Sequence, residues 1–141
     1  MAKGRGHLSP SDELKIMRRI VDITTSETDL DGVLSEVVKT STQITQADSV
    51  FVYLFDGSHE TLVLRASKTP HKSELGKISL KVGEGITGWV AKTSKPVAIP
   101  EKAFEDHRFK AFDVLAEDRY EALLSVPIIY KGKAIGVINV Q

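Results

Sequence analysis

The sequence contains no cysteine among its 141 residues. Disulfide bonds, thiolate metal sites, cysteine nucleophiles and thiol redox chemistry all require that side chain. A chromophore attached through a thioether requires it as well. These classes of chemistry are therefore excluded for this chain.

The sequence also lacks an excess of charge of either sign, because 19 Lys and Arg residues balance 19 Asp and Glu residues. A balanced charge argues against a broad surface for nucleic acid or anionic membrane. No apolar run approaches the roughly 20 residues of a membrane-spanning helix. Residues 1–7 also lack the hydrophobic core of a signal peptide. We expect a cytoplasmic protein that contacts neither nucleic acid nor membrane directly.

The length and composition are those of one globular domain. Apolar residues make up 41% of the chain and charged residues 27%, which is an ordinary balance for a soluble fold. We expect a disordered lead over residues 1–10 and a single domain over residues 11–141.

Ser9 to Asp12 form a capping-box pattern with Pro10 at the first helical position, which predicts the start of a helix. This helix carries two apolar stripes, more than one packing contact requires. The stripes are Leu14, Met17 and Val21, and Ile16, Ile20 and Ile23. We expect one stripe to face the domain and Leu14, Met17 and Val21 to form a homodimer interface. A helix buried deeply in its own domain is the alternative.

A second capping pattern at Thr28 to Asp31 predicts a helix that ends near Ala47. In six later segments the apolar residues either alternate with polar ones or form a continuous run, which is typical of β-strands. These segments are 49–55, 61–68, 77–82, 94–100, 123–130 and 133–140. Residues 49–55 are apolar on both faces, which favours a central, covered strand. We expect a hairpin turn at Lys131–Gly132, and an interruption of the strand ladder at Pro127.

Three glycines, Gly83, Gly85 and Gly88, lead into a run with Ile86, Trp89 and Val90 at helical spacing. This pattern predicts a sharp turn that enters a short helix. Unpaired N–H groups at such a start suit a small polar or anionic ligand. The alternative is purely structural, with glycines that serve as turns and Trp89 as a core residue.

Patterns of catalytic or metal chemistry are weak. The four histidines have no metal-ligand spacing. Asp106 with His107, or Glu117 with Asp118, are adjacent residues of a polar region, whose side chains diverge. The glycine series lacks the Gly-Lys-Ser/Thr ending of a nucleotide-binding loop. We expect neither an enzyme nor a cofactor or metal.

The sequence resembles a GAF domain, the small-molecule sensing module of signalling proteins, from about Ile16 to Gln141. The resemblance is carried by segments 28–34, 47–54, 83–90, 124–129 and 136–140. Residues 106–110 also resemble GAF domains attached to bacterial phosphotransferase regulators, sensor kinases and antitermination domains.

This resemblance implies an α+β fold, with a central antiparallel sheet of five to six strands and helices on both faces. One face would hold helices used for dimerisation, and the other a pocket under the Trp89 helix. The implied pocket residues are Tyr53, Arg65, Ser67, Gly85, Ile86, Thr87, Trp89, Phe104, Phe109 and Ser125.

Two departures from the family limit the expected ligand. The Asn-Lys-Phe-Asp-Glu pattern of cyclic-nucleotide-binding members is absent, which argues against cyclic AMP and cyclic GMP. The lack of cysteine excludes covalent bilin binding and cysteine-dependent methionine sulfoxide reduction. The closing helix of the family is also missing, which suggests a truncated domain.

We therefore expect a regulatory module of a larger bacterial protein that binds an unidentified small-molecule effector. It would signal through a homodimer to an output domain that this sequence does not contain. The alternative is a dimerisation or protein-interaction module that binds no ligand.

Overall fold

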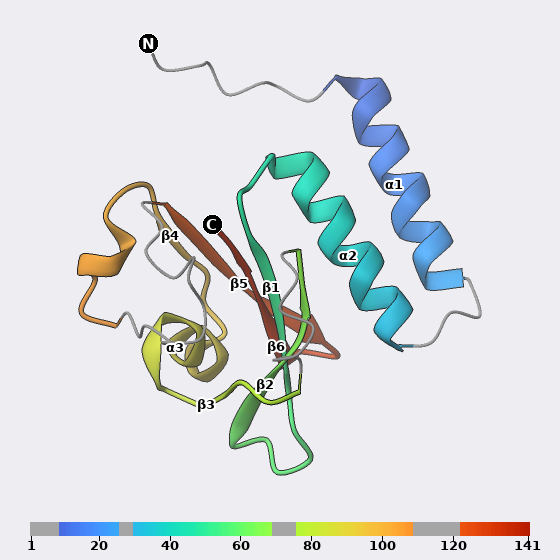
Figure 1. The fold of residues 1–141 in the computed structure, drawn as a ribbon. Helices are drawn as coiled ribbons and strands as arrows, with labels where there is room; N and C mark the ends of the chain where they lie inside the picture. The colour runs from blue at the N-terminus through green and yellow to red at the C-terminus, as the bar shows by residue number, and fades with distance from the viewer. Residues whose placement is uncertain (1–8, 26–29, 69–75, 109–121) are drawn as a thin grey trace.

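The computed structural model of the chain describes residues 9–25, 30–68, 76–108 and 122–141, with the side chains of 21–25 and Phe104 left out. One sheet lies between two helical layers. Helices α1 (Pro10–Thr25) and α2 (Leu30–Thr45) lie on one side, and α3 (Gly85–Thr93) lies on the other (Figure 1). This arrangement confirms the expected α+β fold. Most of the expected lead, residues 1–8, lies outside the described residues.

The sheet has six strands in the order β3-β2-β1-β6-β5-β4, and every neighbouring pair is antiparallel. The bounds are β1 (Val50–Phe55), β2 (Thr61–Ser67), β3 (Ser79–Lys81), β4 (Val97–Ile99), β5 (Leu123–Tyr130) and β6 (Lys133–Val140). A short 3-10 helix, η1 (Ala103–Glu105), follows β4. Strand β4 lies between Pro96 and Pro100 and is an edge strand, a position in which proline is tolerated.

The start of α1 has the predicted capping box. The Asp12 backbone N–H donates to Ser9 Oγ at 3.2 Å, and Ser9 donates through its backbone N–H and its hydroxyl to Asp12 Oδ2. The side-chain hydrogen bond from Ser9 lowers the pKa of Asp12. This end of the helix is therefore defined by local chemistry alone. The capping residues expected before α2 lie outside the described residues.

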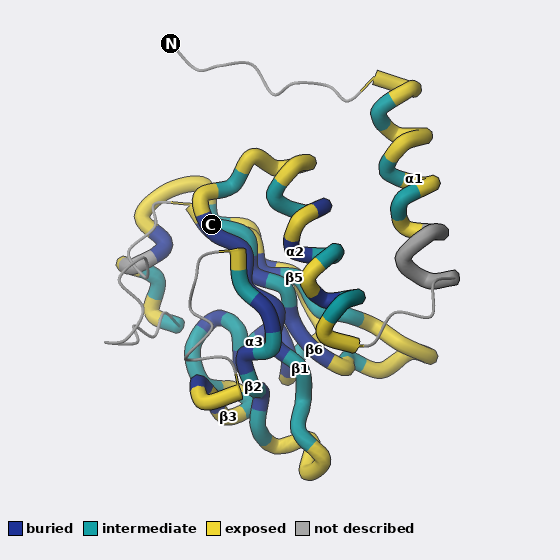
Figure 2. Tube along the Cα trace, turned by 45° about the vertical axis from the view of Figure 1, so that its right-hand side comes forward, coloured by how far each residue is buried: buried dark blue, intermediate teal, exposed yellow. Residues whose placement is uncertain are grey.

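Two hydrophobic cores lie on opposite faces of the sheet. On one face, α2 packs Leu34 and Val38 against Val50, Val52 and Ala66. On the other face, α3 lies on a larger cluster that includes residues of β1, β2, β3, β5 and β6. Figure 2 shows the buried residues gathered along the strands, whereas α1 is largely exposed. Among the described helices, none is both long and apolar enough to cross a membrane.

Strand β1 is covered on both faces, as predicted, because residues 50–53 are all buried. Its pairing with β2 is not regular, however. Val52 pairs with Ala66 and Tyr53 pairs with Leu64, so Arg65 is an extra residue in the ladder. A bulge exchanges the faces of the residues that follow it, which here are Ala66 and Ser67.

The hairpin between β5 and β6 turns at Lys131 and Gly132, as predicted. Both residues have positive φ, 49° and 78°, the conformation that favours glycine in tight hairpin turns. Pro127 itself is paired with Val137, and the irregularity lies one residue further, between Ile128 and Ile129. The interruption of the ladder was predicted at Pro127, and the structure has it between Ile128 and Ile129 instead.

Candidate ligand-binding face

The entry to α3 is a tight loop that requires glycine. Gly83 and Gly85 have positive φ values of 88° and 68°, which side chains with a Cβ rarely adopt. The N–H of Gly83 donates to the carbonyl oxygen of Gly88 at 2.8 Å. A Cβ on Gly88 would lie 2.6 Å from the carbonyl oxygen of Lys81. The three glycines that stand out in the sequence are therefore fixed by backbone geometry.

Glu84 precedes α3 and closes the same loop. Its carboxylate accepts a hydrogen bond from the N–H of Lys81 at 2.8 Å, and its own N–H donates to the Lys81 carbonyl at 2.9 Å. The Glu84 side chain makes no capping bond to the helix. Because the carboxylate places negative charge before the positive end of the helix, it competes with an anionic ligand there. The glycine pattern suggests that an anion binds at the first turn of α3, and the charge of Glu84 weakens such binding.

A chain of three polar side chains connects the sheet to α3. The hydroxyl of Ser125, on β5, donates to Asn139 Oδ1 at 2.6 Å. The Asn139 amide, on β6, donates to Thr87 Oγ1 at 2.6 Å. Ser125 and Asn139 are buried, whereas Thr87 is half-buried. A buried polar chain of this kind fixes the position of α3 over two strands.

The sole tryptophan lies at the edge of the same face. Trp89 is half-buried and packs against the α3-side core. The guanidinium of Arg108 stacks over its ring, 4.8 Å from the centroid. A cation over an indole face is a favourable electrostatic contact. The pair joins α3 to the segment that follows η1.

Asp106 holds Arg108 in this position. Its carboxylate accepts three hydrogen bonds from Arg108, from the backbone N–H, Nε and Nη2, each at 2.9 Å. The side-chain hydrogen bond from Arg108 lowers the pKa of Asp106 to about 2. His107 lies next to it but is 88% exposed, with its Nδ1 3.8 Å from the carboxylate. Asp106 is thus a partner of Arg108 and is not aligned with His107 for acid-base work.

Most of the expected pocket residues lie on the α3 face of the sheet. Tyr53 and Ile86 belong to the packed core there. Ser67 is paired with Phe51 of that core, so it lies on the same face. Gly85, Thr87 and Trp89 lie on α3, and Ser125 lies on β5 beneath it. Phe109 and the side chain of Phe104 fall outside the described residues.

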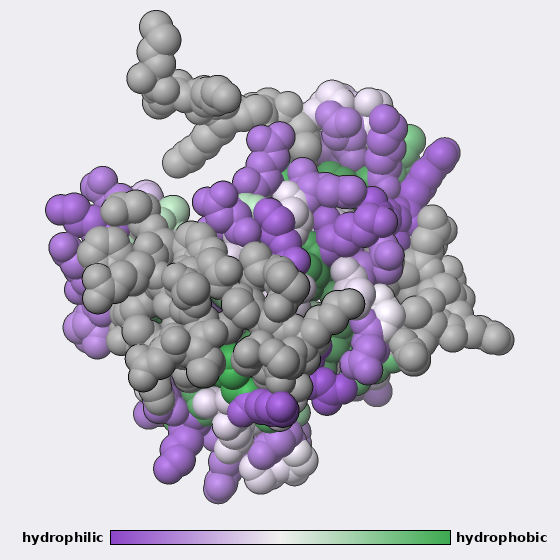
Figure 3. Space-filling view, viewed as in Figure 1, coloured by the Kyte–Doolittle hydropathy of each residue, from purple (hydrophilic) through white to green (hydrophobic). Residues whose placement is uncertain are grey.

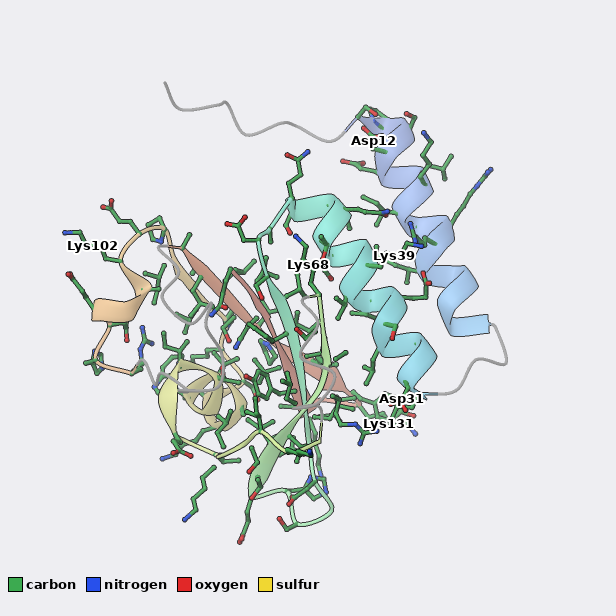
Figure 4. All side chains as sticks on the ribbon, viewed as in Figure 1. Asp12, Asp31, Lys39, Lys68, Lys102 and Lys131 are labelled. Atoms are coloured by element: carbon green, nitrogen blue, oxygen red, sulfur yellow. The ribbon has the colours of Figure 1, made fainter. Side chains whose placement is uncertain are left out.

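Arg65 is not brought together with the other residues. Its Nη2 lies 3.4 Å from Asp31 Oδ1, at the first turn of α2. Figure 4 shows Asp31 at this end of α2, away from α3. Arg65 follows Leu64, a residue of the α3-side core, so alternation along the strand directs Arg65 to the opposite face, toward α2. The grouping inferred from the family therefore does not extend to it.

Asn139 and the Asp106–Arg108 pair were not among the expected site residues. Asn139 could have been identified from the sequence, because it is a polar residue in a strand otherwise expected to be apolar. Buried polar side chains require partners, and Ser125 is the corresponding polar residue in β5. The Arg108 contact with Trp89 joins segments far apart in the sequence and has no local signal.

Polar side chains connect helix α1 to α2. Arg19 donates to Gln43 Oε1 at 2.7 Å and to Glu36 Oε2 at 3.2 Å, both on α2. Beside these bonds lies a hollow of about 260 Å³ between the helices, lined by Asp12, Lys15, Ile16, Arg19, Thr40, Gln43 and Ile44. Hydrophilic side chains cover much of this region, with hydrophobic atoms visible between the helices (Figure 3). The contact is therefore more open than a packed helix pair.

The expected dimer residues lie on the outer side of this helix. Leu14 and Met17 are exposed, and the side chain of Val21 lies outside the described residues. Within the described part of the chain, no group of three or more acidic, histidine or cysteine side chains is arranged to hold a metal ion.

These features define an α+β domain in which one sheet face carries a short glycine-led helix and the other a helical pair. The family model of the GAF domain matches residues 29–141. The chain belongs to the GAF domain family, a family of sensory and regulatory domains found in signalling proteins.

Solved GAF domains have the same fold. The GAF domain of an Acinetobacter phosphoenolpyruvate-protein phosphotransferase is 25% identical with a TM-score of 0.82, covering 95% of this chain and 78% of that one. The corresponding domain from Coxiella burnetii is 29% identical with a TM-score of 0.80, covering 91% of this chain and 76% of that one.

A curated relative is the cGMP-specific 3′,5′-cyclic phosphodiesterase of Drosophila sechellia. It is 28% identical over 149 residues, covering 96% of this chain. The chain spans only 12% of the length of that relative. The match therefore concerns one domain of a much longer enzyme.

Proposed function

We propose that this chain is a non-catalytic sensory domain of a larger bacterial signal-transduction or transcription-regulatory protein in the cytoplasm. An unidentified small molecule binds on the α3 face. The response passes through a homodimer of α1 helices to an output domain outside this sequence. Membership in the GAF family and the likeness to two bacterial phosphotransferase GAF domains support this proposal.

One observation carries the ligand part of the proposal: the polar chain of Thr87, Asn139 and Ser125 lies beside an apolar core on the α3 face. Ligand sites are mostly apolar and contain a few convergent polar groups. A ligand that exchanges hydrogen bonds with Thr87 changes the bond that connects α3 to β6. Trp89 lies nearby, with the guanidinium of Arg108, which is itself paired with Asp106, over its ring.

The signal follows from a difference in affinity between two arrangements of the domain. A ligand shifts a conformational equilibrium only by its preference for one state. On the α3 face, the contacts that a ligand can change are the bond between Thr87 and Asn139 and the stacking of Arg108 on Trp89. The bonds of Arg19 that connect helix α1 to α2 are partly exposed, and such bonds are weak. A small free-energy difference is therefore sufficient to reposition it.

A thermal-shift screen of metabolites, nucleotides and anions tests this proposal, since binding to the native state raises apparent stability. We expect a hit whose shift is lost in Thr87→Val and kept in Thr87→Ser, which retains the hydroxyl. We expect Arg65→Ala, on the opposite face, to respond as the wild type does. Cyclic GMP and cyclic AMP, included as probes, should give no shift.

A hit that survives Thr87→Val but is lost in Arg65→Ala would place the ligand on the wrong face and contradict the proposal. A hit lost in Thr87→Ser as well would show that the hydroxyl is not the recognised group.

The second candidate function is a ligand-free dimerisation or interaction module. A specific observation favours it: Tyr53 and Ile86, two expected pocket residues, are buried in the packed core. In that case the α3 face binds no ligand and is filled by side chains of the domain itself. A library that produces no shift, together with self-association of the protein, would support this second function.

A further inference from the structure

The hollow between α1 and α2 lies on the side of the sheet opposite α3 (Figure 1). Its volume of about 260 Å³ is several times the roughly 30 Å³ of one water molecule. It is just below the roughly 300–1,000 Å³ of pockets that hold drug-sized ligands. Two apolar side chains, Ile16 and Ile44, line it together with charged and polar groups. The hollow is therefore of a size for a short organic molecule.

One lining residue has a polar atom without a partner. Thr40 is only 8% exposed, and its Oγ1 makes no hydrogen bond with any described residue. Two neighbouring threonines of α2 differ in this respect. Thr42 donates to the carbonyl oxygen of Val38 at 2.8 Å, and Thr45 donates to that of Ser41 at 2.7 Å. Buried polar atoms nearly always have a partner, so the Thr40 hydroxyl is available to an acceptor in the hollow.

The lining also contains an unpaired cation. Lys15 is exposed, and within the described part of the chain no hydrogen bond or ion pair involves it. The other charged groups are already engaged. Arg19 is paired with Glu36 at 3.2 Å, and Asp12 accepts a hydrogen bond from the Ser9 hydroxyl at 2.7 Å. The groups left for a ligand are therefore an ammonium, a hydroxyl and apolar surface.

These groups match a carboxylate on a short aliphatic chain. A carboxylate only accepts hydrogen bonds, whereas the Lys15 ammonium and the Thr40 hydroxyl both have donors. Hydrogen bonds that involve ionised groups are the stronger ones. The aliphatic chain buries apolar surface against Ile16 and Ile44. The carboxylate of Asp12 in the same lining opposes an anion, so we expect a modest affinity.

We propose that the hollow is a second ligand site, which binds a small aliphatic carboxylate between α1 and α2. The carboxylate accepts hydrogen bonds from Lys15 and Thr40, and the chain of the ligand lies between Ile16 and Ile44. The Thr40 hydroxyl is covered in this arrangement, so long side chains of the lining rotate to admit the ligand, as is common at binding surfaces. The site depends on the hollow alone and does not require a ligand on the α3 face.

A ligand in this site fastens α1 to α2, because it contacts both helices. Arg19 already connects them through partly exposed bonds, and the ligand adds further contacts. Binding only to the docked arrangement of α1 stabilises that arrangement. Occupancy of the hollow therefore opposes the movement of α1 that the proposed function requires.

An NMR titration of the ¹⁵N-labelled chain with sodium hexanoate tests the site. We expect saturable amide shifts in residues 12–19 and 40–44, with a dissociation constant of about 1 mM, because the ligand has few atoms. Hexanamide, which lacks the charge, should bind at least tenfold more weakly, and hexylamine should not bind. Shifts confined to α3, or the absence of saturable shifts, would overturn the site. Tighter binding of hexylamine would overturn the choice of a carboxylate.

Two variants test the recognising groups. Thr40→Val, which keeps the shape but removes the hydroxyl, and Lys15→Gln should each weaken hexanoate binding about tenfold. Thr40→Ser should retain it. Thr42→Val is the matched control for the hydroxyl, since Thr42 is already bonded to Val38. Arg18→Gln removes the same charge from α1 outside the lining, so it should bind as the wild type does. Wild-type affinity in Thr40→Val or Lys15→Gln would overturn the assigned contacts.

Amide hydrogen exchange tests the fastening of α1. Saturating hexanoate should slow exchange within α1 several-fold in the wild type and leave it unchanged in Thr40→Val. Exchange in α1 that does not respond to bound hexanoate would contradict the fastening.

Thr87→Val separates this site from the α3 face. It should bind hexanoate with wild-type affinity, and loss of binding would place the probe on the α3 face and overturn the second site. Conversely, a thermal-shift screen without any hit that depends on Thr87 would remove the proposed function and leave this site standing.

Discussion

At the scale of single residues, the tightest constraint lies where backbone segments meet without room for a side chain. A Cβ on Gly136 would collide with the carbonyl oxygen of Tyr53, and would lie 2.8 Å from Leu54 Cδ2. Both contacts belong to the pairing of β6 with β1. The carbonyl is part of the ladder and has little freedom to move.

We expect Gly136→Ala to lower the free energy of unfolding by roughly 2–4 kcal/mol, because overpacking here strains a central strand pair. Gly57→Ala is the matched control. It has no atoms within 4 Å of the added Cβ and no positive φ, so its effect should stay within about 0.5 kcal/mol. Denaturant unfolding measures both, and equal effects would contradict this account.

Single residues also show where sequence reasoning succeeds and where it ends. The glycine pattern before Trp89 predicts a turn and a helix, because each signal is local. The contact of Arg108 with Trp89 depends on how distant segments pack. Asn139 lies between these cases: its polarity within an apolar strand is visible, but its partners Ser125 and Thr87 are not adjacent in sequence.

At the scale of elements, the segment after η1 is held by one carboxylate. Asp106 accepts three hydrogen bonds from Arg108, and its pKa is lowered from 3.8 to about 2. A carboxyl group whose pKa is lowered by folding stabilises the folded state at pH values above its ordinary pKa. This contribution is lost as the pH falls through the lowered pKa.

We therefore expect Asp106→Asn to be less stable than the wild type by about 1–2 kcal/mol near pH 5. The difference should shrink as the pH falls from about 4 to 2. Urea unfolding of both proteins across this range provides the measurement. A difference that stays constant down to pH 2 would show that the charge of Asp106 is not the source of the stability.

The attachment of α1 is a second feature at this scale. Removing the side chain in Arg19→Ala deletes the bonds to Gln43 and Glu36. Because these groups are partly exposed, we expect a change of less than about 1 kcal/mol in global stability. We expect a several-fold increase in amide hydrogen exchange within α1, while α2 is unchanged.

Lys15→Ala is the control for this prediction. Lys15 lines the same hollow, and no hydrogen bond or ion pair involves it within the described part of the chain. Its exchange pattern should match that of the wild type. Equal loosening of α1 in both variants would mean that Arg19 does not hold the helix.

The sequence predicts most elements to within two or three residues, since capping and apolar alternation are local. It does not predict the bulge at Arg65. A bulge leaves the apolar count of a strand unchanged but exchanges the faces of later residues. It brings Ser67 to the α3 face, whereas Arg65, which family position alone had placed in the site, stays on the α2 face next to Leu64 in the strand.

At the scale of the whole molecule, the dimer proposal makes a prediction about mass. Met17→Glu introduces a charge into the exposed apolar face of α1, so we expect this variant to remain monomeric where the wild type associates. Sedimentation velocity over a concentration series measures this. Lys15→Glu, which places glutamate on the hollow side, should still associate. An unchanged mass for Met17→Glu would remove this helix from the interface.

The central claim is that a small molecule binds on the α3 face and changes its contacts. The chain has one tryptophan, and it lies on that face with Arg108 stacked over its ring. The most direct measurement is therefore a titration of Trp89 emission with a compound that stabilises the domain. We expect a saturable change whose midpoint matches the thermal-shift affinity and which Thr87→Val abolishes. A compound that stabilises the domain while leaving Trp89 emission unchanged would contradict the claim.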